Sequence, residues 1–133
     1  MKYMLDTNIC IYIIKAKPTT VIERFLKTDL SHIGISSITM SELSYGVHKS
    51  AKPEQNQIAL AQFLAPLEIW PYGDEAAHCY GGLRAHLEKK GTPIGSLDML
   101  IAAHALCVPC ILITNNTREF HRVPGLKIEN WAA

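Results

Sequence analysis

Short apolar runs alternate along the chain with longer segments in which apolar residues recur at helical spacing. Short apolar runs bounded by polar or turn residues are typical of buried strands, whereas apolar positions three and four residues apart indicate one face of a helix. The pattern predicts strands at residues 2–5, 33–35, 67–70 and 110–114, with a weaker fifth at 126–129. It predicts helices at about 7–15, from 18 onward, at 36–50, from 53 onward, at 74–90 and at 96–106.

Strands that alternate with helices in this way predict an α/β fold. The expected sheet is central, mostly parallel and four- to five-stranded, with helices on both faces. We expect Thr7 or Asn8 to cap the first helix, Ser36 or Ser37 the third, and Ser96 the last.

In the helix that Pro53 opens, we expect five residues to face inward: Ile58, Leu60, Ala61, Phe63 and Leu64. Neither a repeat nor a break in composition divides the chain, so we expect residues 1–133 to form one domain.

Composition narrows the class of protein. Of the 133 residues, 48% are hydrophobic and 19% charged, which excludes disorder, collagen and coiled coil as descriptions of the whole chain. The formal net charge is +1, so any contact with RNA phosphates must come from a local cluster of basic residues. No apolar run approaches the ~20 residues that span a bilayer, and Asp6 interrupts the N-terminus before a signal peptide could form. We therefore expect a cytoplasmic protein with no membrane segment.

Polar side chains follow two of the predicted strands directly. Asp6 follows the first strand, and Asn115 and Asn116 follow the fourth. Ligands of open parallel sheets bind beyond the carboxyl ends of the strands, so these side chains are candidates for a site. Asp6 is equally suited to capping the next helix, and the sequence leaves both roles open.

Two further acids occur in predicted helices. Glu42 shares a helix face with Ile38 and Tyr45, and a carboxylate on such a face is costly unless it is paired, bound to a metal or extended into solvent. Asp98 lies in the first turn of a mostly apolar helix, where complementing the helix dipole would by itself explain an acid. If Asp6, Glu42 and Asp98 converge, their mutual repulsion calls for a cation, and Mg²⁺ or Mn²⁺ suits such oxygen ligands.

Four segments, in order, resemble the motifs of PIN domains, and specifically of VapC-type toxins from bacterial VapBC toxin–antitoxin pairs. They are MLDTN at residues 4–8, SSITMSEL at 36–43, GTPIGSLD at 91–98 followed by IAAHA at 101–105, and ITNNTREF at 113–120. The resemblance covers essentially the whole chain. It implies an RNase H-like α/β fold that hydrolyses RNA phosphodiester bonds with Mg²⁺ or Mn²⁺.

Carried over by position, the resemblance makes Asp6, Glu42 and Asp98 the metal-binding catalytic acids. The fourth family position is commonly an Asp; here it is Asn116, which adds no charge and therefore disfavours a tightly held second metal. Glu119 can supply an acid nearby, and we expect a variant active site rather than a dead one. The expected supporting residues are Thr7, Thr114, Asn115 and Glu119.

The same resemblance implies partners. VapC toxins act on structured RNA, and those with similar motifs cut initiator tRNA in its anticodon stem-loop. They form homodimers and assemble with a VapB antitoxin, which threads a C-terminal segment across the active-site groove. Among the basic residues of this chain, Arg118 is the first candidate for an RNA phosphate clamp because it follows Asn115 and Asn116 closely.

Two alternatives belong to other classes of protein. The missing fourth acid allows a catalytically weak PIN-like module that only binds RNA or a partner. Cys107 and Cys110 form a C-x-x-C pair, but we expect the pair at a helix C-terminus, where the dipole opposes a reactive thiolate, and no second pair completes a zinc site. We expect cysteines that act as small apolar residues, and we expect His104 to pack near the sheet or to support the acids from behind.

Overall fold

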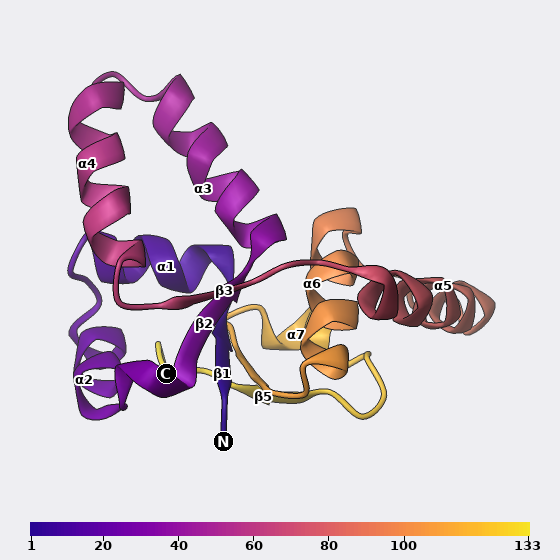
Figure 1. Cartoon of the computed structure of the whole chain (residues 1–133). Coiled ribbons are helices and arrows are strands. Elements are labelled where there is room, and N and C mark those ends of the chain that lie inside the picture. The colour runs from indigo at the N-terminus through magenta and orange to yellow at the C-terminus, as the bar shows by residue number, and fades with distance from the viewer.

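A five-stranded parallel sheet forms the centre of the computed structural model, which describes residues 1–133 (Figure 1). The strand order is β3-β2-β1-β4-β5, and every neighbouring pair is parallel. The strands are β1 (Tyr3–Leu5), β2 (Ile33–Ser36), β3 (Glu68–Trp70), β4 (Ile111–Ile113) and β5 (Lys127–Glu129). All five predicted strands are confirmed, including the weak one.

Seven α-helices connect and cover these strands. They are α1 (Thr7–Ile14), α2 (Thr19–Lys27), α3 (Ser37–Lys49), α4 (Pro53–Leu64), α5 (Asp74–Lys89), α6 (Ser96–Cys107) and α7 (Thr117–Phe120), and a 3₁₀ turn, η1, spans Leu30–His32. Figure 1 shows α3 and α4 as an arm that extends beyond the sheet, with α5 projecting on the other side of the molecule. The predicted α/β fold with helices on both faces is confirmed.

Successive residues of the central strands contribute to two different cores. Met4 and Leu112 belong to a core that α5, α6 and α7 complete, whereas Leu5 and Ile113 belong to one formed with the helices α1 to α4. Side chains of a strand alternate between its two faces, so both faces of β1 and β4 are buried. This burial explains why the strands have continuous apolar sequences.

Some local predictions need correction. Asp6, rather than Thr7 or Asn8, caps α1, and α6 begins after Gly95 with no side-chain cap. In α4, Leu60 is buried, but Ile58 is 61% exposed and Ala61 is also exposed, because the arm leaves the outer side of that helix uncovered. Ser36 caps α3, as predicted.

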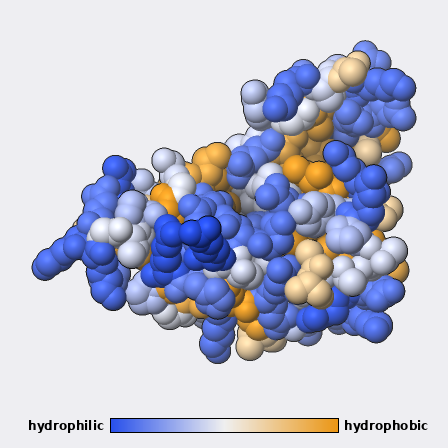
Figure 2. All heavy atoms as spheres, turned by 180° about the vertical axis from the view of Figure 1, so that it is seen from behind, coloured by the Kyte–Doolittle hydropathy of each residue, from blue (hydrophilic) through white to orange (hydrophobic).

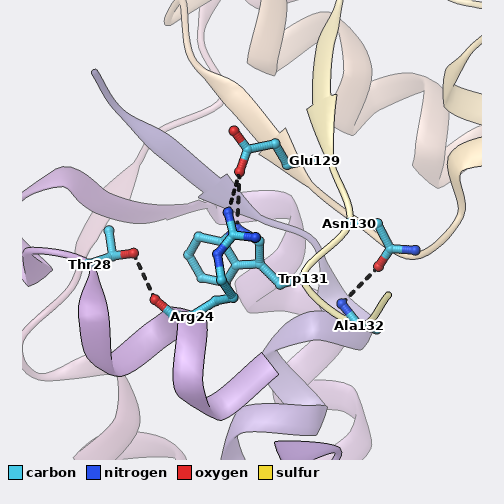
Figure 3. Close-up of polar contacts among 6 residues, drawn as sticks. All are labelled: Arg24, Thr28, Glu129, Asn130, Trp131 and Ala132. Atoms are coloured by element: carbon cyan, nitrogen blue, oxygen red, sulfur yellow. Dashed lines mark hydrogen bonds and ion pairs between the residues drawn. The ribbon is translucent and has the colours of Figure 1, made fainter. Parts of the chain in front are cut away.

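The C-terminal residues are fastened to α2 (Figure 3). Arg24 of α2 donates to Glu129 at 3.0 Å, and the indole of Trp131 donates to the same carboxylate at 3.2 Å. Trp131 is almost fully buried beside Tyr3. These contacts hold β5 at the sheet edge, where the carbonyl of Glu129 accepts from the backbone amide of Thr114 and so orders the segment that follows β4.

None of the helices combines the length and the apolar character that crossing a bilayer requires.

Candidate active site

The ends of β1 and β4 place Asp6 and Thr114 side by side. The Asp6 amide donates to the carbonyl of Ile113 at 3.0 Å, and the Thr114 side chain lies beside the Asp6 carboxylate, where it partly offsets the rise in pKa that burial causes. Asp6 is 7% exposed and also caps α1 by accepting from the Ile9 amide at 3.1 Å. The two roles that the sequence left open therefore coexist, because one carboxylate oxygen can cap while the other faces the edge of the sheet.

Glu42 reaches this edge from α3. Its Oε1 accepts a hydrogen bond at 2.7 Å from the hydroxyl of Thr7, the residue that follows Asp6 in the chain. The start of α3 is fixed by Ser36, whose Oγ accepts from the Ile38 amide and lies 2.8 Å from Nδ1 of the buried His104. His104 thus joins α6 to the beginning of the helix that carries Glu42, which agrees with both expectations for this residue, packing near the sheet and support of the acids from behind.

Asp98 lies in α6, and the Asn116 side chain bridges it to a further acid, Glu119. The Asn116 side-chain amide donates to Asp98 Oδ2 at 3.0 Å and to Glu119 Oε2 at 2.7 Å. The Asn116 backbone amide donates to Thr114 Oγ1 at 2.9 Å, which fixes the turn after β4. The Asn116 amide therefore holds Glu119, three residues further on, beside Asp98.

These four acids lack a cationic side-chain partner. All three ion pairs of the molecule lie elsewhere on the surface, and none includes Asp6, Glu42, Asp98 or Glu119. Burial raises the pKa of Asp6, and the nearby charge of Glu42 raises it further. Burial, together with the neighbouring Glu119, raises the pKa of Asp98 to about 7, while the hydrogen bond from Asn116 lowers the pKa of Glu119. The site thus concentrates negative charge that no ion pair compensates, although the charge of Arg122 lies near enough to contribute to the lowered pKa of Glu119.

The chemistry of this donor set fits a hard divalent cation. Carboxylate and amide oxygens are the ligands that such ions prefer, and Asp6, Glu42, Asp98, Asn116 and Glu119 offer no sulfur or imidazole ligand. In the described side-chain arrangement, no three His, Cys, Asp or Glu side chains stand close enough to share one ion. The acids instead lie in two groups, one around Thr7 and one around Asn116.

The other residues predicted for the site lie at its border. Asn115 turns away from Asn116, and its amide donates to the Tyr12 hydroxyl at 2.8 Å. Arg118 is exposed on α7 and forms no ion pair. The contact with Tyr12 could not be found from the sequence, because 103 residues separate the partners and no motif links them.

The cysteines do not form a redox or zinc centre. All four are free, and burial raises the pKa of Cys110 to about 12, the opposite of what a reactive thiol requires. Cys107 ends α6, so the helix dipole there also disfavours a thiolate, as predicted.

The metal-free protein should lose stability between about pH 4 and pH 7 through Asp98. Its pKa in the folded protein, about 7, exceeds its ordinary value of 3.8, so the folded state retains a proton that the unfolded chain has released. The stability that this retained proton contributes is fully present below pH 3.8, the ordinary pKa of Asp, and is lost as the pH rises to the folded-state pKa of about 7. Asp98→Asn removes this dependence, and after allowance for exposure to water the variant should gain about 1 kcal/mol, or roughly 3–5 °C in Tm, relative to wild type at about pH 8. Thermal melts in EDTA at about pH 4 and pH 8 measure this difference, and parallel pH profiles for the two proteins would contradict it.

Comparison with known proteins places the chain in a family. The PIN domain profile matches residues 3–126. The tRNA(fMet)-specific endonuclease VapC of Salmonella typhimurium is 47% identical over 131 residues, which are 98% of each chain. Ribonuclease VapC2 of Rickettsia felis is 48% identical over 132 residues, again 98% of each chain.

Comparison with solved structures leads to the same family. A chain of DNA-bound VapBC from Salmonella typhimurium has a TM-score of 0.92 at 47% identity, with 98% of each chain covered. A chain of VapBC2 from Rickettsia felis, bound to a DNA fragment from its promoter, has a TM-score of 0.90 at 47% identity and covers 98% of this chain and 99% of that one. The chain therefore belongs to the PIN domain family and, within it, to the VapC group.

Proposed function

We propose that this protein is the toxin of a type II toxin–antitoxin pair and acts as a divalent-metal-dependent endoribonuclease. The observation that carries the proposal is the set of uncompensated acids at the ends of β1 and β4, in a chain that is 47% identical over nearly its whole length to a tRNA(fMet)-specific endonuclease. A cluster of this kind binds cations and repels an RNA phosphate unless a cation is present.

Each residue has a role in the proposed site. Asp6, Glu42 and Asp98 hold the ion, for which Mg²⁺ or Mn²⁺ is the expected choice, and Glu119 supplies the acid that position 116 lacks. Asn116 positions Asp98 and Glu119 through its two hydrogen bonds, while Thr7 and Thr114 orient Glu42 and Asp6. When bound, a divalent cation activates water as a nucleophile and offsets the charge that develops on the phosphoryl oxygens.

The proposed substrate is tRNA, and initiator tRNA cut in its anticodon stem-loop is the specific candidate. The support comes from the names of two relatives, at 47% and 46% identity. Arg118, exposed on α7 close to Asn116 and Glu119 in the chain, is the proposed phosphate clamp. The cytoplasmic location expected from the sequence stays a prediction.

The proposed partner is a VapB-type antitoxin. Structural neighbours at 47% identity are VapBC complexes. A groove of about 500 Å³ between α1, α3 and α4 is lined mostly by apolar residues, among them Ile11, Leu43, Val47 and Leu60, and Glu42 also lines it. Figure 2 shows apolar atoms in the hollow beneath the α3–α4 arm. An antitoxin segment in this groove would reach the acids, and a homodimer of the toxin is the expected core of the hetero-oligomer.

Metal dependence tests the proposed function directly. Purified protein should cleave initiator tRNA with Mg²⁺ or Mn²⁺, stop in EDTA, and recover when excess cation is restored, because the acids repel the phosphate without an ion. Electrophoresis of end-labelled RNA measures the cleavage. Cleavage that continues unchanged in EDTA would contradict the proposal.

Asn116 favours one second candidate, a module that binds RNA or a partner without cutting it. An amide at this position leaves one negative charge fewer than the usual family site. RNA binding without products at any Mg²⁺ or Mn²⁺ concentration would select this candidate.

A further inference from the structure

One side-chain stripe of α3 continues outward from the acid site. Ile38, Glu42, Tyr45 and Lys49 are separated by four, three and four residues, so they share one face of the helix. We call these four residues the α3 stripe. At 1.5 Å per residue, it extends about 10 Å beyond Glu42 to Lys49.

The inner end of the α3 stripe fixes the direction in which it faces. Ile38 packs against the core cluster that contains Met99 and Ala102 of α6. The stripe therefore faces the side of the molecule on which α6 stands, and Asp98 lies in the first turn of that helix. Figure 1 shows α3 beginning near one end of α6 and rising away from the sheet. Tyr45 follows Glu42 by about one helical turn, so the stripe continues outward along α3 from the acid site.

The outer end of the α3 stripe is an exposed aromatic ring with a cation on it. Tyr45 is 65% exposed, whereas both tryptophans are buried. Lys49 Nζ lies 5.0 Å from the Tyr45 ring centroid. An exposed tyrosine beside a lysine is the combination with which proteins bind single-stranded nucleic acid, since the ring stacks on a base and the ammonium group contacts a phosphate.

We propose that Tyr45 and Lys49 form a substrate subsite for single-stranded RNA, in which the Tyr45 ring stacks on a nucleobase next to the scissile phosphate and Lys49 binds a phosphate beyond it. The inference rests on the proposed ribonuclease function and adds to it a determinant of where the strand lies. Tyr45 is a positioning residue in this subsite: it holds the base, while the acids beside Glu42 carry the chemistry.

The neighbouring flank of α3 is a different surface. Leu43, Gly46 and Val47 line the apolar groove beneath the arm, which suits a hydrophobic polypeptide segment. The α3 stripe combines a carboxylate, an aromatic ring and an ammonium group, which suits a nucleotide. Glu42 lies where the two surfaces meet, so an antitoxin segment in the groove would approach the same acids as RNA on the stripe.

Binding tests the subsite without cleavage. In an Asp98→Asn background, fluorescence anisotropy with a labelled initiator tRNA transcript should show about a tenfold weaker Kd for Tyr45→Ala and little change for Tyr45→Phe, which retains the ring. Lys49→Ala should lower the slope of log Kd against log salt by about 0.7, the value for one phosphate contact on a single strand. Lys89→Ala, at the exposed far end of α5, is the matched control and should leave both quantities unchanged.

Two further measurements separate stacking from a structural effect. Tyr45→Trp should add a tryptophan emission that RNA quenches, against the background of the buried Trp70 and Trp131. In the active protein, Tyr45→Ala should raise KM more than it lowers kcat, and an abasic nucleotide beside the mapped cut should remove the difference between Tyr45→Ala and wild type.

The possible failures are distinguishable. If wild type cuts RNA in a metal-dependent way but Tyr45→Ala binds and cuts like wild type, the subsite is overturned and the proposed function stands. If Tyr45→Ala weakens only antitoxin binding, the stripe belongs to the antitoxin interface and the proposal is wrong. A wild-type protein that cuts no RNA would overturn the proposed function and the subsite together.

Discussion

Replacing Asp98 with alanine should reduce RNA cleavage at least about a hundredfold while the protein remains folded. Asp98 is the acid with the most strongly raised pKa of the site, and its removal takes one of the proposed metal ligands and the acceptor of the Asn116 amide. Removing a residue that only supports the ligands of a catalytic ion commonly lowers activity or metal affinity by about one to two orders of magnitude, and removing a ligand itself should lower activity more. Single-turnover cleavage of initiator tRNA, at saturating Mg²⁺, measures the effect.

Asp74→Ala is the matched control. Asp74 lies in the first turn of α5 as Asp98 lies in the first turn of α6, so both substitutions remove an acid that complements a helix dipole. Asp74 is exposed and makes no contact with the acid site, and its substitution should leave cleavage unchanged. Equal activity of Asp98→Ala and Asp74→Ala would mean that Asp98 only stabilises α6 through the helix dipole, and its assignment as a metal ligand would be wrong.

Gly34→Ala should destabilise the fold by about 3 kcal/mol, since overpacking a well-packed core typically costs about 1–3 kcal/mol and this site has little freedom to relax. A Cβ at position 34 would stand 2.7 Å from the carbonyl oxygen of Glu68 and 2.7 Å from two ring carbons of Trp70. The carbonyl belongs to β3, which pairs with β2 at this point, and the Trp70 ring is buried, so neither can move away cheaply. Urea denaturation measures the loss.

Gly82→Ala provides the comparison for this prediction. Gly82 lies within α5, and a Cβ there meets nothing within 4 Å. Because alanine has the higher helix propensity, this variant should gain up to about 1 kcal/mol. A Gly34→Ala variant as stable as wild type would show that β2 and β3 can separate. Such freedom would extend to Ser36 and to the start of the helix that carries Glu42.

The acids of the site show which features could be predicted from the sequence and which could not. The positions of Asp6 after a strand and of Asp98 at a helix start follow from local patterns, and the order of the four family motifs joins both residues with Glu42. The roles of these residues remain proposals. What local patterns could not predict is the grouping of the acids: Glu42 with Thr7, and Asp98 with Asn116 and Glu119.

The incorrect burial predictions for Ile58 and Ala61 have one physical cause. Ile58 and Ala61 were expected to face inward because apolar residues usually do, but α4 lies in the arm and packs against the rest of the molecule through one side only.

Asn115 and Asn116 are chemically identical neighbours in the chain. One turns to Tyr12 and the other to Asp98, and only the placement of α1 and α6 around the end of β4 separates them.

The strands, most of the helices, the α/β class and the family follow from the amino-acid sequence alone, because periodicity, capping and motif spacing act over a few residues or are read directly as residue types. The strand order, the pairing of the acids, the exposure of Tyr45 and the separation of the apolar groove from the α3 stripe become visible only in the folded chain. These features depend on residues far apart in the chain, such as Thr7 and Glu42, whose proximity results from the packing of whole helices on the sheet.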